Sequence, residues 1–334
     1  MIIPLYDTTA NEVADKLVSV RREGGAVALS RVLTLLVPVG AAAAEDAIKA
    51  TNHASMEHPC RVIVLVERDP GAAPALDAEI RVGGDAGASE VVVLRLRGTT
   101  ADHLDSVVTP LLLPDVPIVT WWPDTMPTCP STSPLGRVAD RRVTDSRLAE
   151  GPVAERLAQL RACYAPGDTD LAWTRLTWWR AHLAAILDQP PYEVVTRVVI
   201  YGHDEHPSPD LLAAWLGWKL HCPVRLIRGA VTLTRVDLER PSGTVTIERP
   251  DGSDMADLTL PGAARQRFPL PRRPVADCLS EELRRLDPDP VYGRVLADGL
   301  DWIMAPGRLE EVVSEATIPL VTRSATGPAE GRTA

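Results

Sequence analysis

The first part of the chain alternates between segments of helical periodicity and short runs that are almost wholly apolar. Thr9 and Glu12 form a capping box, and the apolar residues that follow them recur at helical spacing, which predicts a first helix. Further helices are predicted over 44–57 and 102–113. The apolar runs, which have the length of buried strands, are 26–37, 60–66, 76–82, 90–96 and 117–123. This alternation predicts an α/β domain over 1–125, with helices covering a mixed sheet.

A proline-rich, charged segment follows this domain. The segment from Pro123 to Pro134 contains four prolines, and charges of both signs alternate over 136–146. Residues 126–150 are therefore predicted to connect two domains. The second domain is expected over 151–322, and 323–334 is expected to be a disordered tail.

The second domain is predicted to be α+β, with an antiparallel meander. Its helices are predicted over 151–164, 170–188, 208–222 (with Ser208 as N-cap), 275–286 and 291–304. A first strand is predicted over 192–201. Turn residues separate the next apolar segments, which are 224–227, 230–238 and 244–248, with an edge strand near 258–260. The three consecutive segments form the predicted meander, and the whole chain is predicted to be a two-domain α/β protein.

Charge and hydropathy exclude several classes of protein. Acidic residues outnumber basic ones by 45 to 35, and the arginines are scattered, so a nucleic-acid-binding surface is not expected. No apolar run approaches the roughly 18 residues that span a bilayer. The N-terminal residues lack the basic and apolar regions of a signal peptide. These features predict a cytoplasmic protein without a membrane partner.

The five cysteines are isolated in sequence. They are Cys60, Cys129, Cys163, Cys222 and Cys278. No C-x-x-C pair exists, and the odd count favours reduced thiols. Cys60 begins an apolar strand, so it is predicted to be a buried structural thiol.

The chain offers few candidates for catalysis. His203 and His206 flank two acids, but no third distant ligand is evident, so a solvated turn is preferred to a metal site. Neither a serine-hydrolase elbow nor a phosphate-binding P-loop is found. A candidate anion loop comprises Gly83, Gly84 and Gly87, which lie between two predicted strands, and Arg81 near the end of the first of these strands. Its spacing does not match a dinucleotide fingerprint, and a tight connection is preferred. We expect no catalytic residue, metal or cofactor, which favours a binding or regulatory protein.

Tryptophan is unusually frequent, with eight Trp to one Phe. On a helical projection of 170–188, Trp179 lies on an apolar stripe and Trp173 and Trp178 flank it. Arg175 lies close to the stripe, so it is expected to form an ion pair or to lie at the stripe's edge. Two interpretations stay open. In the first, Trp179 is a core residue and the flanking tryptophans are half-buried. In the second, a partner-binding face is formed by Trp173, Arg175, Trp178 and Arg180.

Five segments, in order, resemble one known family. They are DTT at 7–9 leading to REGGAVALSRVLTL at 22–35, EHPCRVIV at 57–64, IRVGGDAGASEVV at 80–92, LLLPD at 111–115 with WWP at 121–123, and DLAWTRL at 170–176 with WR at 179–180. They are similar to the OpcA family, the glucose-6-phosphate dehydrogenase assembly proteins of actinobacteria and cyanobacteria. The region after 188 is less distinctive.

The resemblance implies a non-catalytic protein that binds glucose-6-phosphate dehydrogenase, favours its active oligomer and raises its activity as an allosteric activator. It would thereby control flux into the oxidative pentose phosphate pathway and the supply of NADPH. The partner-contact residues expected on this basis are Trp121, Trp122, Trp173, Arg175, Trp178 and Arg180. One alternative is a sugar-phosphate-binding enzyme or metabolite sensor that uses the Arg81 loop. Another is a structural bridge that assembles the dehydrogenase without changing its kinetics.

Overall fold

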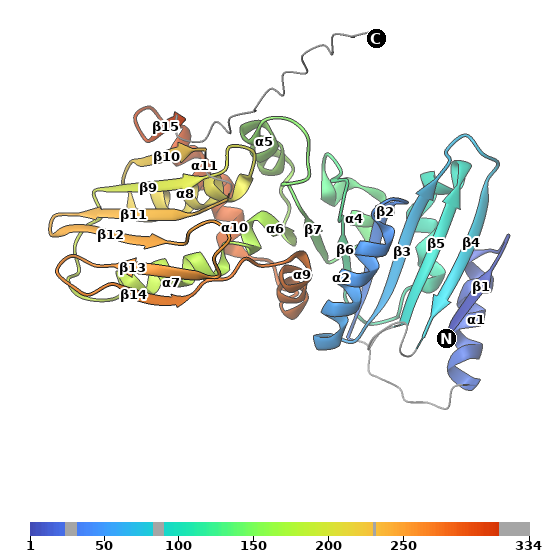
Figure 1. Cartoon of the computed structure of the whole chain (residues 1–334). Helices are drawn as coiled ribbons and strands as arrows, with labels where there is room; N and C mark the ends of the chain where they lie inside the picture. The colour runs from blue at the N-terminus through green and yellow to red at the C-terminus, as the bar shows by residue number, and fades with distance from the viewer. Residues whose placement is uncertain (24–31, 83–89, 230–231, 314–334) are drawn as a thin grey trace, which may run out of the picture.

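Two β-sheets lie side by side in this chain, with helices between and around them (Figure 1). The computed structural model describes residues 1–23, 32–82, 90–229 and 232–313. Strands β1–β8 form the first sheet and β9–β15 the second. The predicted α/β class with two sheet regions is confirmed.

The first sheet is mostly parallel. Its strands are β1 (Ile2–Leu5), β2 (Leu33–Gly40), β3 (Cys60–Arg68), β4 (Ala75–Arg81), β5 (Glu90–Arg97), β6 (Ile118–Trp121), β7 (Arg141–Thr144) and β8 (Asp168–Asp170). They run in the order β1-β4-β5-β3-β2-β6-β7-β8. The six strands from β5 to β8 in this order are parallel, and β4 and β1 add an antiparallel edge. The parallel block has the 3-2-1-4-5-6 order of doubly wound dinucleotide-binding sheets.

The helices of this region are α1 (Ala10–Glu23), α2 (Ala44–Glu57), η2 (Gly98–His103), α3 (Leu104–Val108), η3 (Thr109–Leu111), η4 (Pro130–Thr132), α4 (Pro134–Val138) and α5 (Val153–Cys163). The capping box before α1 is confirmed. The Thr9 N–H donates to Glu12 Oε2 over 2.8 Å, and the Glu12 N–H donates back to Thr9 Oγ1 over 3.3 Å. The single helix predicted over 102–113 is wrong. Pro110 lacks the N–H that an α-helix needs there, and the segment divides into α3 between two 3-10 turns.

Two predicted segments of the first domain differ from the structure. The strand predicted over 26–37 begins at Leu33 and continues to Gly40, while 24–31 lie outside the described residues. The connection predicted over 126–150 contains α4 and β7, and β7 pairs with β6 inside the first sheet. We propose that a boundary drawn between the two sheets follows β8.

Both faces of the first sheet are buried. Leu35, Val37 and Trp121 belong to a core on the α2 face, while Leu36 and Trp122 belong to a core on the α1 face. The near-continuous apolar strands seen in the sequence follow from this two-sided burial.

The second sheet mixes parallel and antiparallel pairs. Its strands are β9 (Arg197–Gly202), β10 (Val224–Arg228), β11 (Arg235–Arg240), β12 (Gly243–Glu248), β13 (Met255–Thr259), β14 (Gln266–Pro269) and β15 (Leu309–Val313). Their order is β14-β13-β12-β11-β9-β10-β15. The predicted meander is correct for β11 and β12, and the predicted edge strand corresponds to β13; β14, which was not predicted, pairs antiparallel with β13. The prediction is wrong for β10, which pairs in parallel with β9 and β15. A helix crosses between β9 and β10, and such a crossover joins parallel strands.

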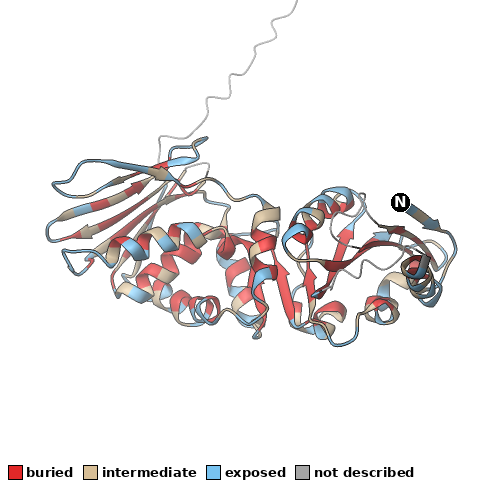
Figure 2. Cartoon of the chain, turned by 90° about the horizontal axis from the view of Figure 1, so that it is seen from below, coloured by how far each residue is buried: buried red, intermediate tan, exposed pale blue. Residues whose placement is uncertain are grey.

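Helices cover one face of the second sheet (Figure 2). The helices of the C-terminal half are α6 (Leu171–Thr174), α7 (Thr177–Leu187), α8 (Pro207–Leu220), α9 (Val275–Arg284), α10 (Pro290–Arg294), the π-helical turn η5 (Val295–Gly299) and α11 (Leu300–Met304). The helix predicted over 170–188 is divided into α6 and α7. Ser208 does not cap α8, because it lies inside the helix, whose N-cap residue is His206; its hydroxyl donates to the Ala172 carbonyl oxygen over 2.8 Å. Residues 323–334 lie outside the described part of the chain.

Helix α9 returns to the first sheet, although it was predicted to complete the second domain. Cys278, Leu279 and Leu283 lie in the core shared with α2. Arg284 Nη2 lies 3.1 Å from Glu57 Oε2 across the same contact. The two halves of the chain therefore interlock through α9. Across the described ranges, no helix combines the length and apolar character needed to cross a bilayer.

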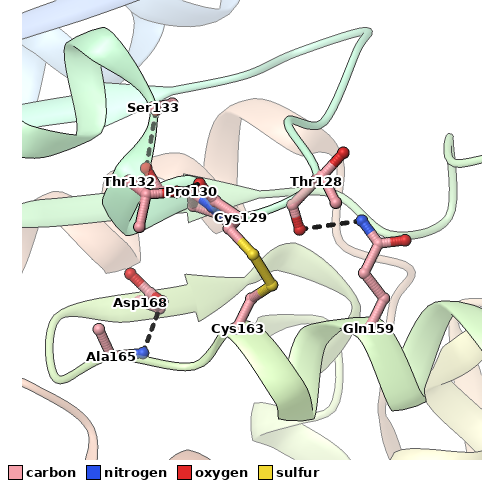
Figure 3. Close-up of a disulfide and its surroundings, with 9 residues drawn as sticks. All are labelled: Thr128, Cys129, Pro130, Thr132, Ser133, Gln159, Cys163, Ala165 and Asp168. Atoms are coloured by element: carbon pink, nitrogen blue, oxygen red, sulfur yellow. Dashed lines mark hydrogen bonds between the residues drawn. A yellow bond between two sulfur atoms is a disulfide. The ribbon is translucent and has the colours of Figure 1, made fainter.

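A disulfide joins Cys129 to Cys163, with 5.1 Å between their Cα atoms (Figure 3). It links the segment before η4 to the end of α5, beside a hydrogen bond of 2.9 Å from Gln159 Nε2 to the Thr128 carbonyl oxygen. The prediction of reduced thiols is wrong for this pair. Residues 34 apart meet only through tertiary packing, so their spacing gave no signal. Cys60 is buried and outside any disulfide, as predicted.

Candidate functional site

The carboxyl ends of β2 and β6 meet at the switch point of the parallel sheet, where doubly wound folds bind their ligands. A crevice of about 310 Å³ lies there. Gly40 ends β2, Glu67 lies near the end of β3, and Trp122 and Asp124 follow β6. The topology thus places an acidic pair where a dinucleotide fold holds a pyrophosphate.

Asp124 takes the place that a phosphate would need. Its Oδ2 accepts a hydrogen bond from the Gly40 backbone N–H over 2.8 Å, and a Cβ on residue 40 would lie 3.0 Å from that oxygen. Four alanines follow Gly40 in place of further glycines, and Glu45 and Asp46 occupy the first turn of α2. A phosphate site at a helix N-terminus requires free N–H groups and a positive field.

The charged side chains that line this crevice are also acidic. Burial raises the pKa of Glu67, and the charges of Asp124 and Asp102 raise it further. None of the described residues that line the crevice is an arginine or a lysine. The crevice therefore does not fit the pyrophosphate of a dinucleotide. The sequence analysis missed Glu67 and Asp124, because it searched for glycine spacing and not for the strand order that selects this edge.

The predicted tryptophan–arginine face is largely internal. The Trp173 indole N–H donates to Asp289 Oδ2 over 2.8 Å, and the Arg180 guanidinium lies 3.7 Å from the centre of the Trp173 ring. Burial lowers the pKa of Arg180 to about 10. This stack packs within the second domain, and Trp173 belongs to its core.

Arg175 forms an ion pair, as predicted. Its Nη1 and Nη2 donate to the two carboxylate oxygens of Asp145 over 2.8 and 2.6 Å. Asp170 lies next to this pair and caps α6 by accepting from the Ala172 N–H over 2.8 Å. Burial raises the pKa of Asp170, and the charge of Asp145 acts in the same direction. These groups fix the start of α6 against β7 and β8.

The structure separates the six residues expected to contact a partner. Those that are buried or half-buried are Trp121, Trp122, Trp173, Arg175 and Arg180. Trp178 is exposed, at 37% of its surface. The six residues therefore do not form one exposed surface, since Trp121 and Trp122 pack on opposite faces of the first sheet and Trp173 packs in the second domain.

Trp178 lies at the junction of α7 and α9. The Arg273 guanidinium is 5.1 Å from the centre of its ring. Glu281 of α9 accepts from Thr177 Oγ1 over 2.8 Å and pairs with Arg273 Nη2 over 2.6 Å. These contacts hold an exposed aromatic ring on a rigid, interdomain surface.

The remaining candidates from the sequence are the Arg81 loop and the turn that contains His203 and His206. Arg81 Nε donates to Glu79 over 2.5 Å, and its Nη2 contacts Glu45 over 3.2 Å. Gly83, Gly84 and Gly87, the rest of the candidate anion loop, lie outside the described residues. His203 and His206 stack with their ring centres 4.3 Å apart. In the part of the chain that the structure describes, no group of three or more His, Cys, Asp or Glu residues is arranged to hold a metal ion.

Two family models of OpcA proteins match the chain in succession. Residues 51–162 match the model of the N-terminal domain of the glucose-6-phosphate dehydrogenase subunit, and 166–296 match the model of its C-terminal domain. The chain belongs to the OpcA family. The resemblance noted in the sequence is thereby confirmed, and with it an association with the assembly of glucose-6-phosphate dehydrogenase.

Solved structures add a distant likeness for this OpcA-family chain. One is glucose-6-phosphate 1-dehydrogenase from Mycobacterium avium, at 13% identity and a TM-score of 0.39, covering 85% of this chain and 94% of that one. Another is a Gfo/Idh/MocA family oxidoreductase from Vibrio cholerae, at 12% identity and a TM-score of 0.36, covering 80% and 94%. The search of curated proteins found no match.

Proposed function

We propose that this chain is a non-catalytic protein that binds glucose-6-phosphate dehydrogenase, stabilises its active oligomer and raises its activity. The observation that carries this proposal is the match to both OpcA domains, in order, across 51–162 and 166–296. Higher dehydrogenase activity would increase oxidative pentose phosphate flux and the supply of NADPH in the cytoplasm.

The switch-point crevice supports a non-catalytic role. A dehydrogenase that used this edge of the sheet would need backbone N–H groups and positive charge for the pyrophosphate. Here the Gly40 N–H is taken by Asp124, and Glu67 lies in the same crevice. The proposed activity therefore belongs to the partner enzyme, and this chain contributes binding energy.

Activation of this kind requires tighter binding to the active state of the enzyme than to the inactive one. A coupling free energy of about 1–3 kcal/mol gives roughly 5–150-fold effects. Stabilising an oligomer follows the same rule, because a protein that binds only the assembled form shifts the equilibrium toward it.

We propose the surface around Trp178 as part of the contact with the enzyme. Trp178 is an exposed aromatic residue with arginine beside it, and Trp and Arg are enriched where interfaces gain most of their free energy. The ring is held at the α7–α9 junction, so binding there would engage both domains of this chain.

Mixing purified dehydrogenase with this chain and measuring the mass of the mixture by light scattering tests the assembly role. At an enzyme concentration where the dehydrogenase dissociates, the chain is expected to restore the larger species and to co-elute with it. Activity at an enzyme concentration where assembly is already complete separates the two modes of action. A rise there supports allosteric activation, and an unchanged rate supports a structural bridge.

A further inference from the structure

A second cavity, of about 140 Å³, lies in the seam between the two domains, away from the switch-point crevice. The loop after β7, the start of α8 and the segment after β14 border it. Its basic side chains are Arg147, Arg175, Arg249, Arg272, Arg273 and the weaker base His206. No carboxylate is found among the described residues that line it.

Arg249 is a buried cation at this cavity that has no carboxylate paired with it among the described residues. The residue is 6% exposed, and its guanidinium donates to two backbone oxygens, of Leu270 over 3.0 Å and of Leu233 over 3.1 Å. Its Nε has no hydrogen-bond partner, and no carboxylate of the described chain pairs with it. A buried cation without a counterion is costly, so an anion in the cavity would remove an existing penalty.

The remaining arginines are only partly neutralised. Arg175 pairs with Asp145, Arg272 with Asp251, and Arg273 with Glu281. Arg147 reaches the already paired Asp145 at 3.9 Å. Five guanidinium groups thus share three carboxylates. The Nε of buried Arg273 also lacks a partner.

Two further features make the cavity suitable for an anion. Helix α8 has 14 residues and begins at the cavity, where its positive dipole end adds to the arginines. The pKa of His206 is lowered to about 4 by burial and then by its interactions with His203, Arg147 and Arg175. His206 is therefore neutral near pH 7, so its ring can donate one hydrogen bond without repelling a cation.

The walls also include an apolar part. Leu176 and Trp179 line the cavity beside the arginines, and both belong to the core of the second domain. A phosphate-bearing molecule would place its charged group against the guanidinium forks and its carbon skeleton against this wall.

We propose that this arginine cavity binds the phosphate group of a small molecule, either free phosphate or a phosphate monoester. Fork-shaped donors match the oxygens of a phosphate, and the excess of guanidinium groups over carboxylates suits a dianion. This site goes beyond the proposed assembly function and lies on this chain alone.

Calorimetric titration of the full chain with inorganic phosphate and with glucose 6-phosphate, at constant ionic strength, tests the proposal. Arg147 and Arg272 are the part-exposed members, so the double variant R147Q/R272Q should fold. It is expected to bind at least about tenfold more weakly than the unmodified chain. The matched control is Arg267, an exposed arginine of β14 that pairs with Asp257 of β13. The variant R267Q should bind within about twofold of the unmodified chain.

The two probes distinguish the source of the phosphate group. Tighter binding of glucose 6-phosphate supports an ester, and equal or tighter binding of inorganic phosphate supports the free ion. The proposal is overturned if neither probe binds saturably, if R147Q/R272Q binds as well as the unmodified chain, or if succinate binds as tightly as both. The enzyme is absent from this experiment, so its failure is distinguishable from failure of the assembly function.

Discussion

Asp124 Oδ2 accepts a hydrogen bond from the Gly40 backbone N–H over 2.8 Å, at the edge of the sheet where doubly wound proteins bind dinucleotides. This contact predicts that the crevice does not bind a dinucleotide. Fluorescence titration of the full chain with NADH, which has the pyrophosphate but no phosphate monoester, should show no saturation. A dissociation constant in the micromolar range would contradict this account of the crevice.

The tryptophans at 173 and 178 should respond differently to truncation. Trp173→Ala removes a buried ring that holds Asp289 and Arg180, and it should lower the free energy of unfolding by about 3–5 kcal/mol. Trp178→Ala should leave stability nearly unchanged and weaken binding to the dehydrogenase. Urea denaturation and co-elution measure the two effects, with Tyr6→Ala as an exposed aromatic control. Full binding by the Trp178 variant would exclude this surface.

Reduction of the Cys129–Cys163 disulfide should destabilise the chain. The bridge closes a loop between residues 34 apart, and removing such a constraint lowers the free energy of unfolding by about 2–4 kcal/mol. Thermal unfolding with and without reductant measures the change. Cys222→Ser is a control, because buried Cys222 lies outside the bridge. An equal effect of reductant on a Cys129→Ser/Cys163→Ser variant would show that the bridge is not responsible.

His206 should make stability depend on pH between about 6.5 and 4. Its pKa is lowered from 6.5 to about 4 in the folded chain by burial, His203 and the arginines 147, 175 and 156. The unfolded chain therefore binds a proton in this range that the folded chain does not. Stability contributed by neutral His206 is complete above pH 6.5 and is lost as the pH falls toward 4. His206→Gln should flatten this part of a urea-denaturation profile, and an unchanged slope would contradict the assignment.

Local sequence signals predicted several regular elements of the first domain. The capping box of Thr9 and Glu12 is present, and α2 has the predicted bounds 44–57. These features depend on neighbouring residues. By contrast, β7 and β8 are four and three residues long, and their sequences RRVT and DTD are polar. Buried ion pairs, such as that of Arg142 with Asp168, compensate their burial, so hydropathy could not reveal them.

Properties set by tertiary contacts were beyond the reach of periodicity. The helical projection identified Trp173 and Trp178 as flanking residues but could not show which flank faces another element. Contacts with the distant residues Asp289 and Tyr292 bury Trp173, whereas Trp178 stays exposed. The arginine cavity draws residues from 147 to 273, and no short motif contains them.

The initial rate of NADP reduction by purified glucose-6-phosphate dehydrogenase from the same genome, titrated with this chain, tests the central claim most directly. The account predicts a saturable rise in rate at a fixed stoichiometry, with a complex that co-elutes. An unchanged rate at every ratio, with no complex at concentrations where the enzyme dissociates, would contradict it.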